Sequence, residues 1–182
     1  MFIKSQLFQI VEKYFQAEIN YLKISNSSDF YIDAKRNIAF NYSKLYEFEV
    51  AEKKIIQLIN ESYQDYHLKK ILADFYRVEK KYVKAISQYT DLIIENKDDV
   101  WKIYYLRGIC FERSNKWALA EKDFLRSLEL INYESADVLN YLAYGWLERD
   151  ENIDEAMKML IKANNANPDN HYILDSLAWA YF

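Results

Sequence analysis

Small and bulky residues recur along this chain with a period of 34 to 36 residues. A first column of small residues consists of Ala17, Ala51, Ala85, Ala120 and Ala156. A bulky side chain stands three residues before each of these positions, and another stands four residues after it. A second column of small residues, each followed three residues later by an aromatic, consists of Ala39, Ala73, Gly108, Ala143 and Ala178. Columns that stay in phase over several copies indicate a repeat architecture.

Spacings of three and four residues place each set on one face of an α-helix. Polar segments separate the predicted helix pairs at 25–29, 61–65, 95–99, 132–135 and 165–170. Shorter turns within the pairs are predicted at 43–45, 79–80, 114–115 and 150–152. Because short links between helices force antiparallel neighbours, the pattern predicts an all-α solenoid of antiparallel helix pairs, with about ten helices.

This pattern divides the chain into one repeat domain over residues 1–182. The complete repeats are predicted at 29–62, 63–97, 98–132 and 133–168. Residues 1–28 form a degenerate repeat, in which 1–24 reads either as one long helix or as a pair. Residues 169–182 form the first helix of a truncated repeat.

The best copy of the pattern has Gly108, Phe111, Trp117, Ala120 and Phe124 in phase. In these columns essentially the whole chain resembles the tetratricopeptide repeat (TPR) family, and residues 101–182 look like its bacterial members especially. The resemblance implies a right-handed superhelix whose first helices line an inner, ligand-binding face. The sequence departs from the family at Arg107, where Leu is usual, and at turns that carry Asn115 and Asp150 instead of Gly.

Composition narrows the possible fold classes and kinds of ligand. The chain holds only 2 Gly and 1 Pro among 182 residues, while aromatic residues make up 17%. This scarcity argues against hairpin-rich sheets and excludes Gly-rich phosphate loops. The net charge is -4, with most of the surplus acid after residue 132. No global basic field therefore favours binding of nucleic acid.

Groups capable of catalysis are few. His67 and His171 stand about three repeats apart, and repeats in a solenoid touch only their neighbours. Cys110 follows Gly108 on a helix that is expected to be packed, so a buried structural thiol is predicted. No Cys/His set has metal-ligand spacing. The sequence thus predicts a non-enzymatic protein with no catalytic residue, metal or cofactor.

With catalytic and metal sites excluded, the remaining candidate for a binding site is the surface of the first helix of each pair. The positions expected to face the groove lie six before, three before, one after and four after each small residue of the second column. The candidate peptide-groove residues are Arg36, Phe40, Lys70, Asp74, Arg77, Lys102, Tyr105, Asn140, Tyr144, Tyr172, Asp175 and Trp179.

These candidates change in character along the chain, from basic in the early repeats to aromatic in the late ones. We hypothesise that a peptide places acidic groups toward Lys70 and Arg77, and apolar side chains toward Tyr144 and Trp179; the alternative is an ordinary mixed helix face. Chaperone-binding members of the family clamp a carboxylate with Lys and Asn. Asn is missing at Phe40 and at Asp74, so this subtype is rejected.

The end of the chain is apolar where a solenoid usually carries a polar cap, with Leu174, Trp179 and Tyr181 on the last helix. We therefore expect a fragment, or association with a second copy or a partner. No apolar stretch is long enough to span a membrane, and the start does not resemble a signal peptide. The sequence does not decide between the cytoplasm and the periplasm as the compartment of the protein.

The leading interpretation is a scaffold that binds a peptide or protein segment in its concave groove. The alternative is a recruiting arm of a larger protein whose catalytic or membrane part lies outside this chain. Direct RNA binding by the early basic repeats is disfavoured by the net negative charge.

Overall fold

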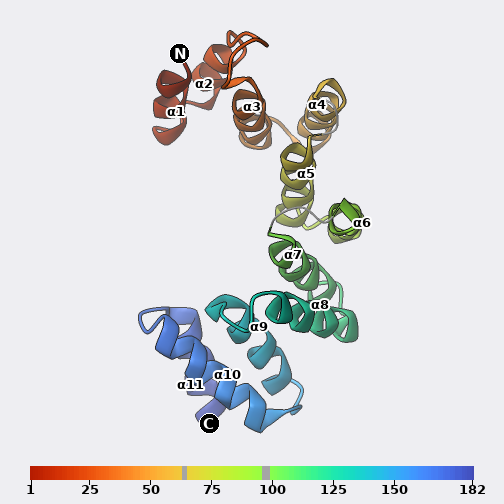
Figure 1. Ribbon diagram of the computed structural model, residues 1–182, viewed down its shortest axis with the longest axis vertical. Helices are drawn as coiled ribbons and strands as arrows, with labels where there is room; N and C mark the ends of the chain where they lie inside the picture. The colour runs from red at the N-terminus through yellow and green to blue at the C-terminus, as the bar shows by residue number, and fades with distance from the viewer. Residues whose placement is uncertain (63–64, 96–98) are drawn as a thin grey trace. The chain divides into compact units, whose positions relative to one another are not determined.

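The computed structural model describes residues 1–62, 65–95 and 99–182, and these residues form eleven α-helices and no strand (Figure 1). The helices are α1 (Phe2–Ile10), α2 (Tyr14–Tyr21), α3 (Tyr31–Leu45), α4 (Phe48–Glu61), α5 (Tyr66–Val78), α6 (Tyr82–Glu95), α7 (Val100–Glu112), α8 (Trp117–Leu130), α9 (Ala136–Leu147), α10 (Ile153–Ala166) and α11 (His171–Tyr181). The all-α class is confirmed, with eleven helices instead of about ten.

The chain forms two compact units, Met1–Leu92 and Ile93–Phe182, which are described separately below. The repeat boundaries predicted at residue 63 and between residues 97 and 98 fall outside the described residues. The division into repeats therefore stays a prediction.

In the first unit, residues 1–24 form two helices, α1 and α2, and not one long helix. Glu12, with φ 57°, makes the turn between them. Side-chain hydrogen bonds tie this pair to α3. The Tyr21 hydroxyl donates to Gln9 Oε1 at 2.9 Å, and Gln9 Nε2 donates to Asn41 Oδ1 at 2.7 Å. Asn41 is buried, so its amide needs these partners.

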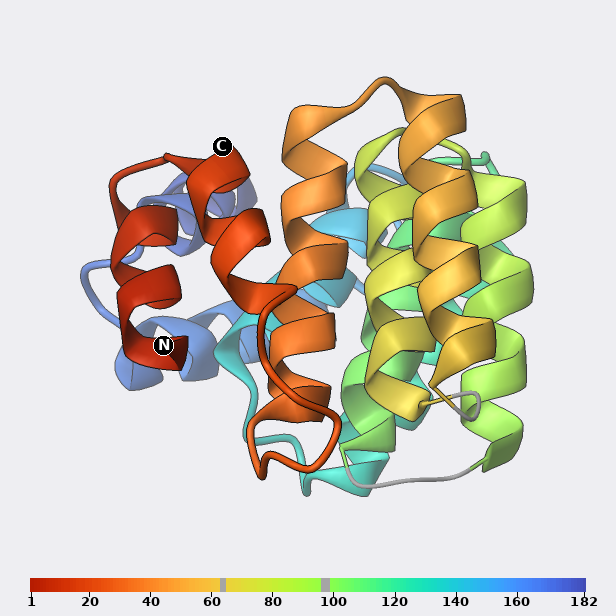
Figure 2. The ribbon, with the colours of Figure 1, turned by 90° about the horizontal axis from the view of Figure 1, so that it is seen from above.

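Helices α3, α4 and α5 pack side by side, with α3 and α4 antiparallel (Figure 2). Small residues of both columns are fully buried at these contacts, as predicted. Two polar networks reinforce the packing. Glu52 Oε1 accepts from the Tyr76 hydroxyl at 2.7 Å and from Lys84 Nζ at 2.6 Å. The buried Tyr89 hydroxyl donates to Asp74 Oδ1 at 2.6 Å.

The turns within pairs follow one design at four of the five places. Glu12, Lys80, Asn115 and Asp150 take φ values of 57°, 57°, 57° and 54°, in the left-handed region that usually favours glycine. The N–H of the next residue then bonds a carbonyl in the last turn of the first helix, as Lys81 does to Tyr76 at 2.8 Å. The turn predicted at 43–45 is wrong, because α3 continues through Leu45 and the chain turns at 46–47.

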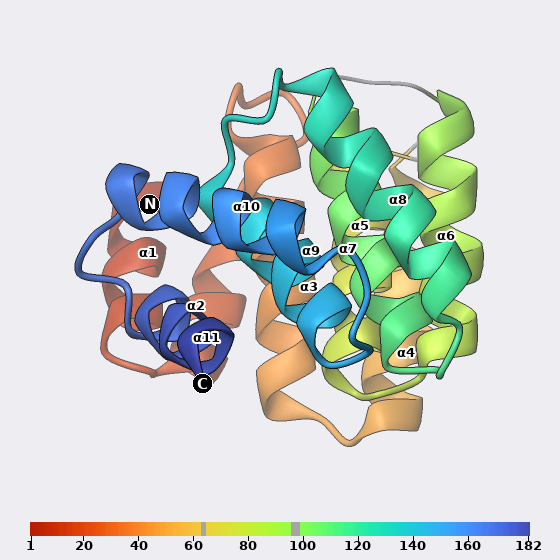
Figure 3. The ribbon, with the colours of Figure 1, turned by 90° about the horizontal axis from the view of Figure 1, so that it is seen from below.

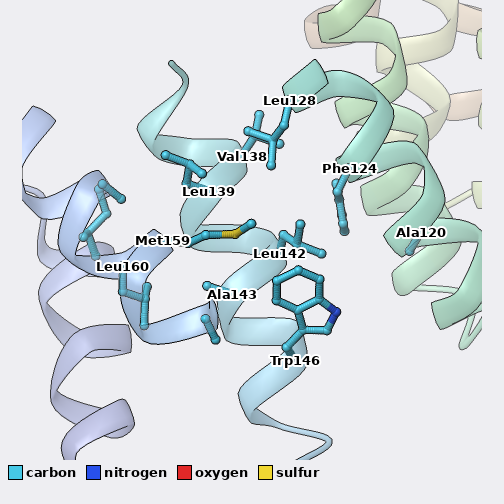
Figure 4. Packing of buried hydrophobic residues seen from close by; sticks show 13 residues of the cluster. Ala120, Phe124, Leu128, Val138, Leu139, Leu142, Ala143, Trp146, Met159 and Leu160 are labelled. Carbon is cyan, nitrogen blue, oxygen red and sulfur yellow. The ribbon is translucent and has the colours of Figure 1, made fainter. Parts of the chain in front are cut away.

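The second unit has a continuous apolar core. Helix α7 packs on α8 and α9 packs on α10 (Figure 3). Buried side chains from α8, α9 and α10 converge, among them Phe124, Leu142 and Leu160 (Figure 4). Both glycines of the chain allow close approach here. A Cβ at Gly108 would lie 2.6 Å from the Phe124 ring, and one at Gly145 would collide with Trp117.

The structure explains the Arg107 departure from the family pattern. Arg107 Nε and Nη2 donate to the two carboxylate oxygens of Asp123, at 2.7 and 2.8 Å. The Asp123 side chain is only 5% exposed. A leucine at position 107 would leave this carboxylate buried without its cation. The arginine at this position is therefore explained by its bidentate ion pair between α7 and α8.

Candidate partner-binding surfaces

In the first unit, the predicted basic residues already hold carboxylates of their own chain. Arg36 Nη1 lies 2.9 Å from Asp33 Oδ1, and Arg36 Nη2 lies 3.3 Å from Asp65 Oδ2. Asp65 also caps α5 by accepting from the Leu68 N–H at 3.0 Å. Nearby on α3, Phe40 is 43% exposed, and the Lys44 ammonium lies 5.5 Å from its ring centroid. Arg36 therefore stabilises the packing of α3 on α5.

Asp74 is the centre of the other predicted cluster in the first unit. Lys70 Nζ lies 3.0 Å from its carboxylate, and Arg77 Nε lies 3.9 Å away. The Tyr89 hydroxyl bonds the same carboxylate, and burial followed by the charge of Asp74 raises the pKa of Tyr89. Asp74 thus neutralises part of the positive charge of Lys70 and Arg77. The sequence predicts Asp74 itself as a residue that faces the groove.

The second unit contains a cleft of about 830 Å³, which we term the C-terminal cleft. It is built from the first helices α7, α9 and α11, with Trp117 from the start of α8. Its lining residues are Tyr105, Glu112, Arg113, Trp117, Asp137, Asn140, Tyr141, Tyr144, Gly145, Glu148, Asn170, Tyr172, Asp175, Ser176 and Trp179. Six candidates line it, namely Tyr105, Asn140, Tyr144, Tyr172, Asp175 and Trp179. Lys102 does not, and pairs with Asp99 at 2.8 Å.

Hydrogen bonds at the helix starts position these side chains. Ser135 accepts from the Val138 N–H at 3.4 Å and begins α9. Asn170 accepts from the N–H groups of Tyr172 and Ile173, at 3.0 and 3.4 Å, and begins α11. Such N-caps satisfy donors that the helix itself leaves open. The exposed aromatics of the cleft therefore project from capped, regular helices.

Aromatic and acidic groups meet in the C-terminal cleft. Tyr172, Trp179 and Tyr144 are 80%, 54% and 40% exposed. A hydrogen bond to Glu148, followed by burial and the charge of Glu148, raises the pKa of Tyr144. Among the described residues, Asn140 Oδ1 is buried and accepts no hydrogen bond. The cleft thus offers flat rings and carboxylates.

Several lining residues were not among the candidates. Trp117 was assigned to a packing column, yet its ring also borders the cleft, where the Arg149 guanidinium lies 4.1 Å from the ring centroid. Tyr141 lies between Tyr105 and Phe124, with centroids 5.8 and 5.5 Å away. A wider helical face, with the position two before the small residue, would have included Tyr141 and Ser176.

Reactive groups do not gather into a chemical site. His67 and His171 are both exposed, and Cys110 is buried, as the sequence predicts. The described ranges contain no group of three or more His, Cys, Asp or Glu that could hold a metal ion. Over the same ranges, no helix combines the length and apolarity needed to cross a bilayer. In the second unit, the arrangement best suited to recognition is the C-terminal cleft.

Antiparallel helix pairs joined by short turns, with buried small residues at their contacts, define an all-α fold of packed helix pairs, and comparison with known proteins shows which known fold this is. No family model matches the chain. A TPR repeat-containing protein of Pseudomonas aeruginosa is 36% identical over 77 residues, which span 42% of this chain and only 13% of that protein.

Two solved structures share the fold. A tetratricopeptide repeat protein from Parabacteroides merdae has a TM-score of 0.75 at 20% identity, over 100% of this chain and 71% of that one. A chain of the APC/C hetero-tetramer Cut9–Hcn1 has a TM-score of 0.73 at 15% identity, over 98% of this chain and 35% of that one. The chain therefore has the TPR fold and resembles TPR proteins in sequence, as predicted.

Proposed function

We propose that this chain is a non-enzymatic scaffold that binds a segment of a partner protein. The C-terminal cleft is the observation that carries the proposal. Its size suits a peptide, and its exposed aromatic rings offer a large apolar area at low cost in side-chain entropy. TPR folds generally mediate contacts between proteins, and Cut9–Hcn1 is itself a complex of two proteins.

The first unit contributes a second contact surface in this proposal, formed by Arg36 and Phe40 on α3 and by Lys70 and Arg77 beside Asp74 on α5. Arg36 is balanced by Asp33 and Asp65, whereas Lys70 and Arg77 carry one positive charge more than Asp74, and this excess attracts acidic groups of a partner. The exposed Phe40 ring adds an apolar contact. The two surfaces are tested separately.

Affinity capture with the full chain as bait, from a lysate of the organism that makes it, tests the proposal. Three variants are compared with the parent chain: Tyr144→Ala/Trp179→Ala, Lys70→Ala/Arg77→Ala, and the fourfold combination. We expect the first variant to lose most of the captured partner and the combination to lose all of it. Circular dichroism and thermal melts confirm that each variant is folded. Unchanged capture by a folded fourfold variant would refute the proposal.

A recruiting arm of a larger protein is the second candidate function. The observation that favours it is the short share, 13%, that the matched segment takes of the Pseudomonas aeruginosa protein. TPR repeats there stand within a much longer chain. The full-length reading frame that contains this sequence decides between the two candidates, because a catalytic or membrane domain beside the repeats would establish the arm.

Self-association through α11 is a further part of the proposal. Leu174 and Tyr181 are 42% and 71% exposed on this helix, next to Trp179. Light scattering over a range of concentrations should show dimers or larger species, and Leu174→Ser/Tyr181→Ser should restore the monomer. A monomeric parent chain at high concentration would rule self-association out.

A further inference from the structure

The C-terminal cleft carries more negative than positive charge. Four carboxylates line it, those of Glu112, Asp137, Glu148 and Asp175, against the single cation Arg113. Arg113 Nε lies 3.3 Å from Glu112 Oε2, so these two largely balance each other. Glu148 lies 3.8 Å from Arg149.

Asp137 and Asp175 account for the uncompensated charge. Neither forms an ion pair within the part of the chain that the structure describes, and both are exposed. A concave wall concentrates the field of such charges and attracts groups of opposite sign. The cleft is therefore electrostatically matched to a cation and repels acidic peptides and nucleic acid.

The two aspartates stand beside exposed aromatic rings on the same helical faces. On α11, Asp175 lies between Tyr172 and Trp179, at spacings of three and four residues. On α9, Asp137 and Tyr144 lie on one face, with Asn140 between them. Because aromatic faces attract cations, α11 offers rings and a carboxylate to the same positive group. On α9, Asp137 and Tyr144 are seven residues apart, about 10 Å along the helix axis, so they contact different groups of a bound segment.

This combination distinguishes arginine from lysine. A guanidinium is planar, so it can stack on a ring while its N–H groups bond both oxygens of a carboxylate. An ammonium group satisfies only the charge.

We propose that the C-terminal cleft binds an extended protein segment that carries arginine side chains, held by Asp137 and Asp175 against Tyr144, Tyr172 and Trp179. The inference rests on the proposed function and adds the chemistry of the partner segment. Apolar side chains of the same segment contact the remaining ring surfaces, while the arginines set its charge and register.

Four labelled dodecapeptides with the repeats Gly-Arg-Leu, Gly-Lys-Leu, Gly-Gln-Leu and Gly-Glu-Leu test the inference by fluorescence anisotropy with the full chain. We expect affinity to decrease in the order Arg, Lys, Gln, Glu, with at least a tenfold difference between the Arg and Gln peptides. Raising the salt concentration from 50 to 500 mM should remove most of that difference.

Asp137→Asn/Asp175→Asn should weaken binding of the Arg peptide about tenfold and leave the Gln peptide unchanged. The matched control is Asp150→Asn/Asp154→Asn, which removes the same charge from exposed positions of the second unit outside the cleft. Equal losses in both variants would show a general charge effect and overturn the inference.

Failure of the inference and failure of the proposed function give different results. If the Arg and Gln peptides bind equally and Tyr144→Ala/Trp179→Ala abolishes both, the cleft binds peptides but does not select arginine. If no peptide binds at 1 mM, the arginine inference is overturned, and the lysate capture above separately decides whether the chain is a scaffold. Strongest binding of the Glu peptide would also overturn it.

Discussion

The two units place different chemistry at equivalent repeat positions. In the first unit, Tyr89 occupies a packing column, and its hydroxyl donates to Asp74. In the second unit, Phe124 occupies the same column and Ile109 the position of Asp74, and both belong to an apolar cluster. The column therefore requires a bulky side chain, and a hydroxyl on that side chain is matched by an acceptor on the neighbouring helix. Both units have a buried apolar core, and at these positions the first unit adds a hydrogen bond where the second has apolar contact.

One hydrogen bond between an aromatic residue and a glutamate occurs at equivalent positions in both units. Tyr76 donates to Glu52 at 2.7 Å, and Trp146, in the same column, donates through Nε1 to Glu121 at 2.6 Å. Each glutamate directly follows a small residue of the first column. Burial alone would raise the pKa of Glu52, but hydrogen bonds from Lys84 and Tyr76 lower it overall. The same bridge therefore stabilises both units.

Removing the cation of the Arg107–Asp123 ion pair should have the largest effect. Arg107→Leu leaves the buried Asp123 carboxylate without its cation, and we expect a loss of about 3–5 kcal/mol in unfolding free energy. Urea denaturation followed by tryptophan fluorescence measures it in the second unit, which contains all four tryptophans. Arg107→Leu/Asp123→Leu should recover most of the loss. A double variant as unstable as the single one would contradict this explanation.

Alkaline pH should weaken the first unit before the second. Burial raises the pKa of Tyr21 and of Tyr42 to about 12, from an ordinary value of 10.0. Unfolded tyrosines ionise near pH 10 while these two keep their protons, so stability is complete below pH 10 and is lost as the pH rises toward 12.

Each pKa unit corresponds to at most about 1.4 kcal/mol, and to less where water reaches the hydroxyl, so we expect a loss of about 1–2 kcal/mol for the pair. Urea titrations monitored by far-ultraviolet circular dichroism at pH 9 to 11.5 measure it. Tyr21→Phe/Tyr42→Phe should flatten the pH dependence. A slope that the double variant leaves unchanged would assign alkaline unfolding to other groups.

A methyl group at Gly108 should destabilise the second unit by an intermediate amount. It would lie 2.6 Å from the fully buried Phe124 ring, and overpacking costs about 1–3 kcal/mol, partly offset by about 1 kcal/mol of helix propensity. Tryptophan fluorescence in urea measures the net loss for Gly108→Ala. Adding Phe124→Leu should cost less in this variant than in the parent chain. Additive losses would mean that the two residues do not compete for space.

Substituting glycine for the turn residues with left-handed backbone conformation should have the smallest effect, and it should raise the free energy of unfolding. Lys80, with φ 57°, has a side chain that disfavours this conformation, so Lys80→Gly should gain about 0.5–1 kcal/mol. Asn115→Gly should gain only a few tenths, because asparagine tolerates the conformation better. Thermal melts compare the two. A larger gain at Asn115 than at Lys80 would contradict the backbone explanation.

The repeat columns predict the fold because they report contacts between helices of neighbouring pairs, which have the same geometry in every copy. The turn at 43–45 was misplaced because its residues fit a helix as well as a turn, and no glycine or asparagine stops α3 there. Asp74 was read as a groove residue from the face of α5 alone. Its partner Tyr89 lies on α6, and a pattern along one helix does not show which side chain crosses from another.

The candidate site shows the same limit. Spacing along α7, α9 and α11 found six residues that line the C-terminal cleft. It missed Trp117, which comes from the start of a second helix, and it could not predict that Asp65, at the start of α5, would hold Arg36 of α3. Those contacts depend on how helices from different repeats are brought together.

The bridge from a glutamate to the aromatic residue of the following repeat restricts how such arrays can be rearranged. Glu52 and Glu121 each need a ring with a hydrogen-bond donor, which Tyr76 and Trp146 supply. At the corresponding positions 86 and 111, the chain has Ile and Phe, which need no such match. Exchanging whole repeats between these places would set a carboxylate against a phenylalanine or leave a tyrosine hydroxyl without its acceptor. Each helix pair is therefore matched to the pair that follows it, and the order of the pairs along the chain cannot be changed without breaking these hydrogen bonds.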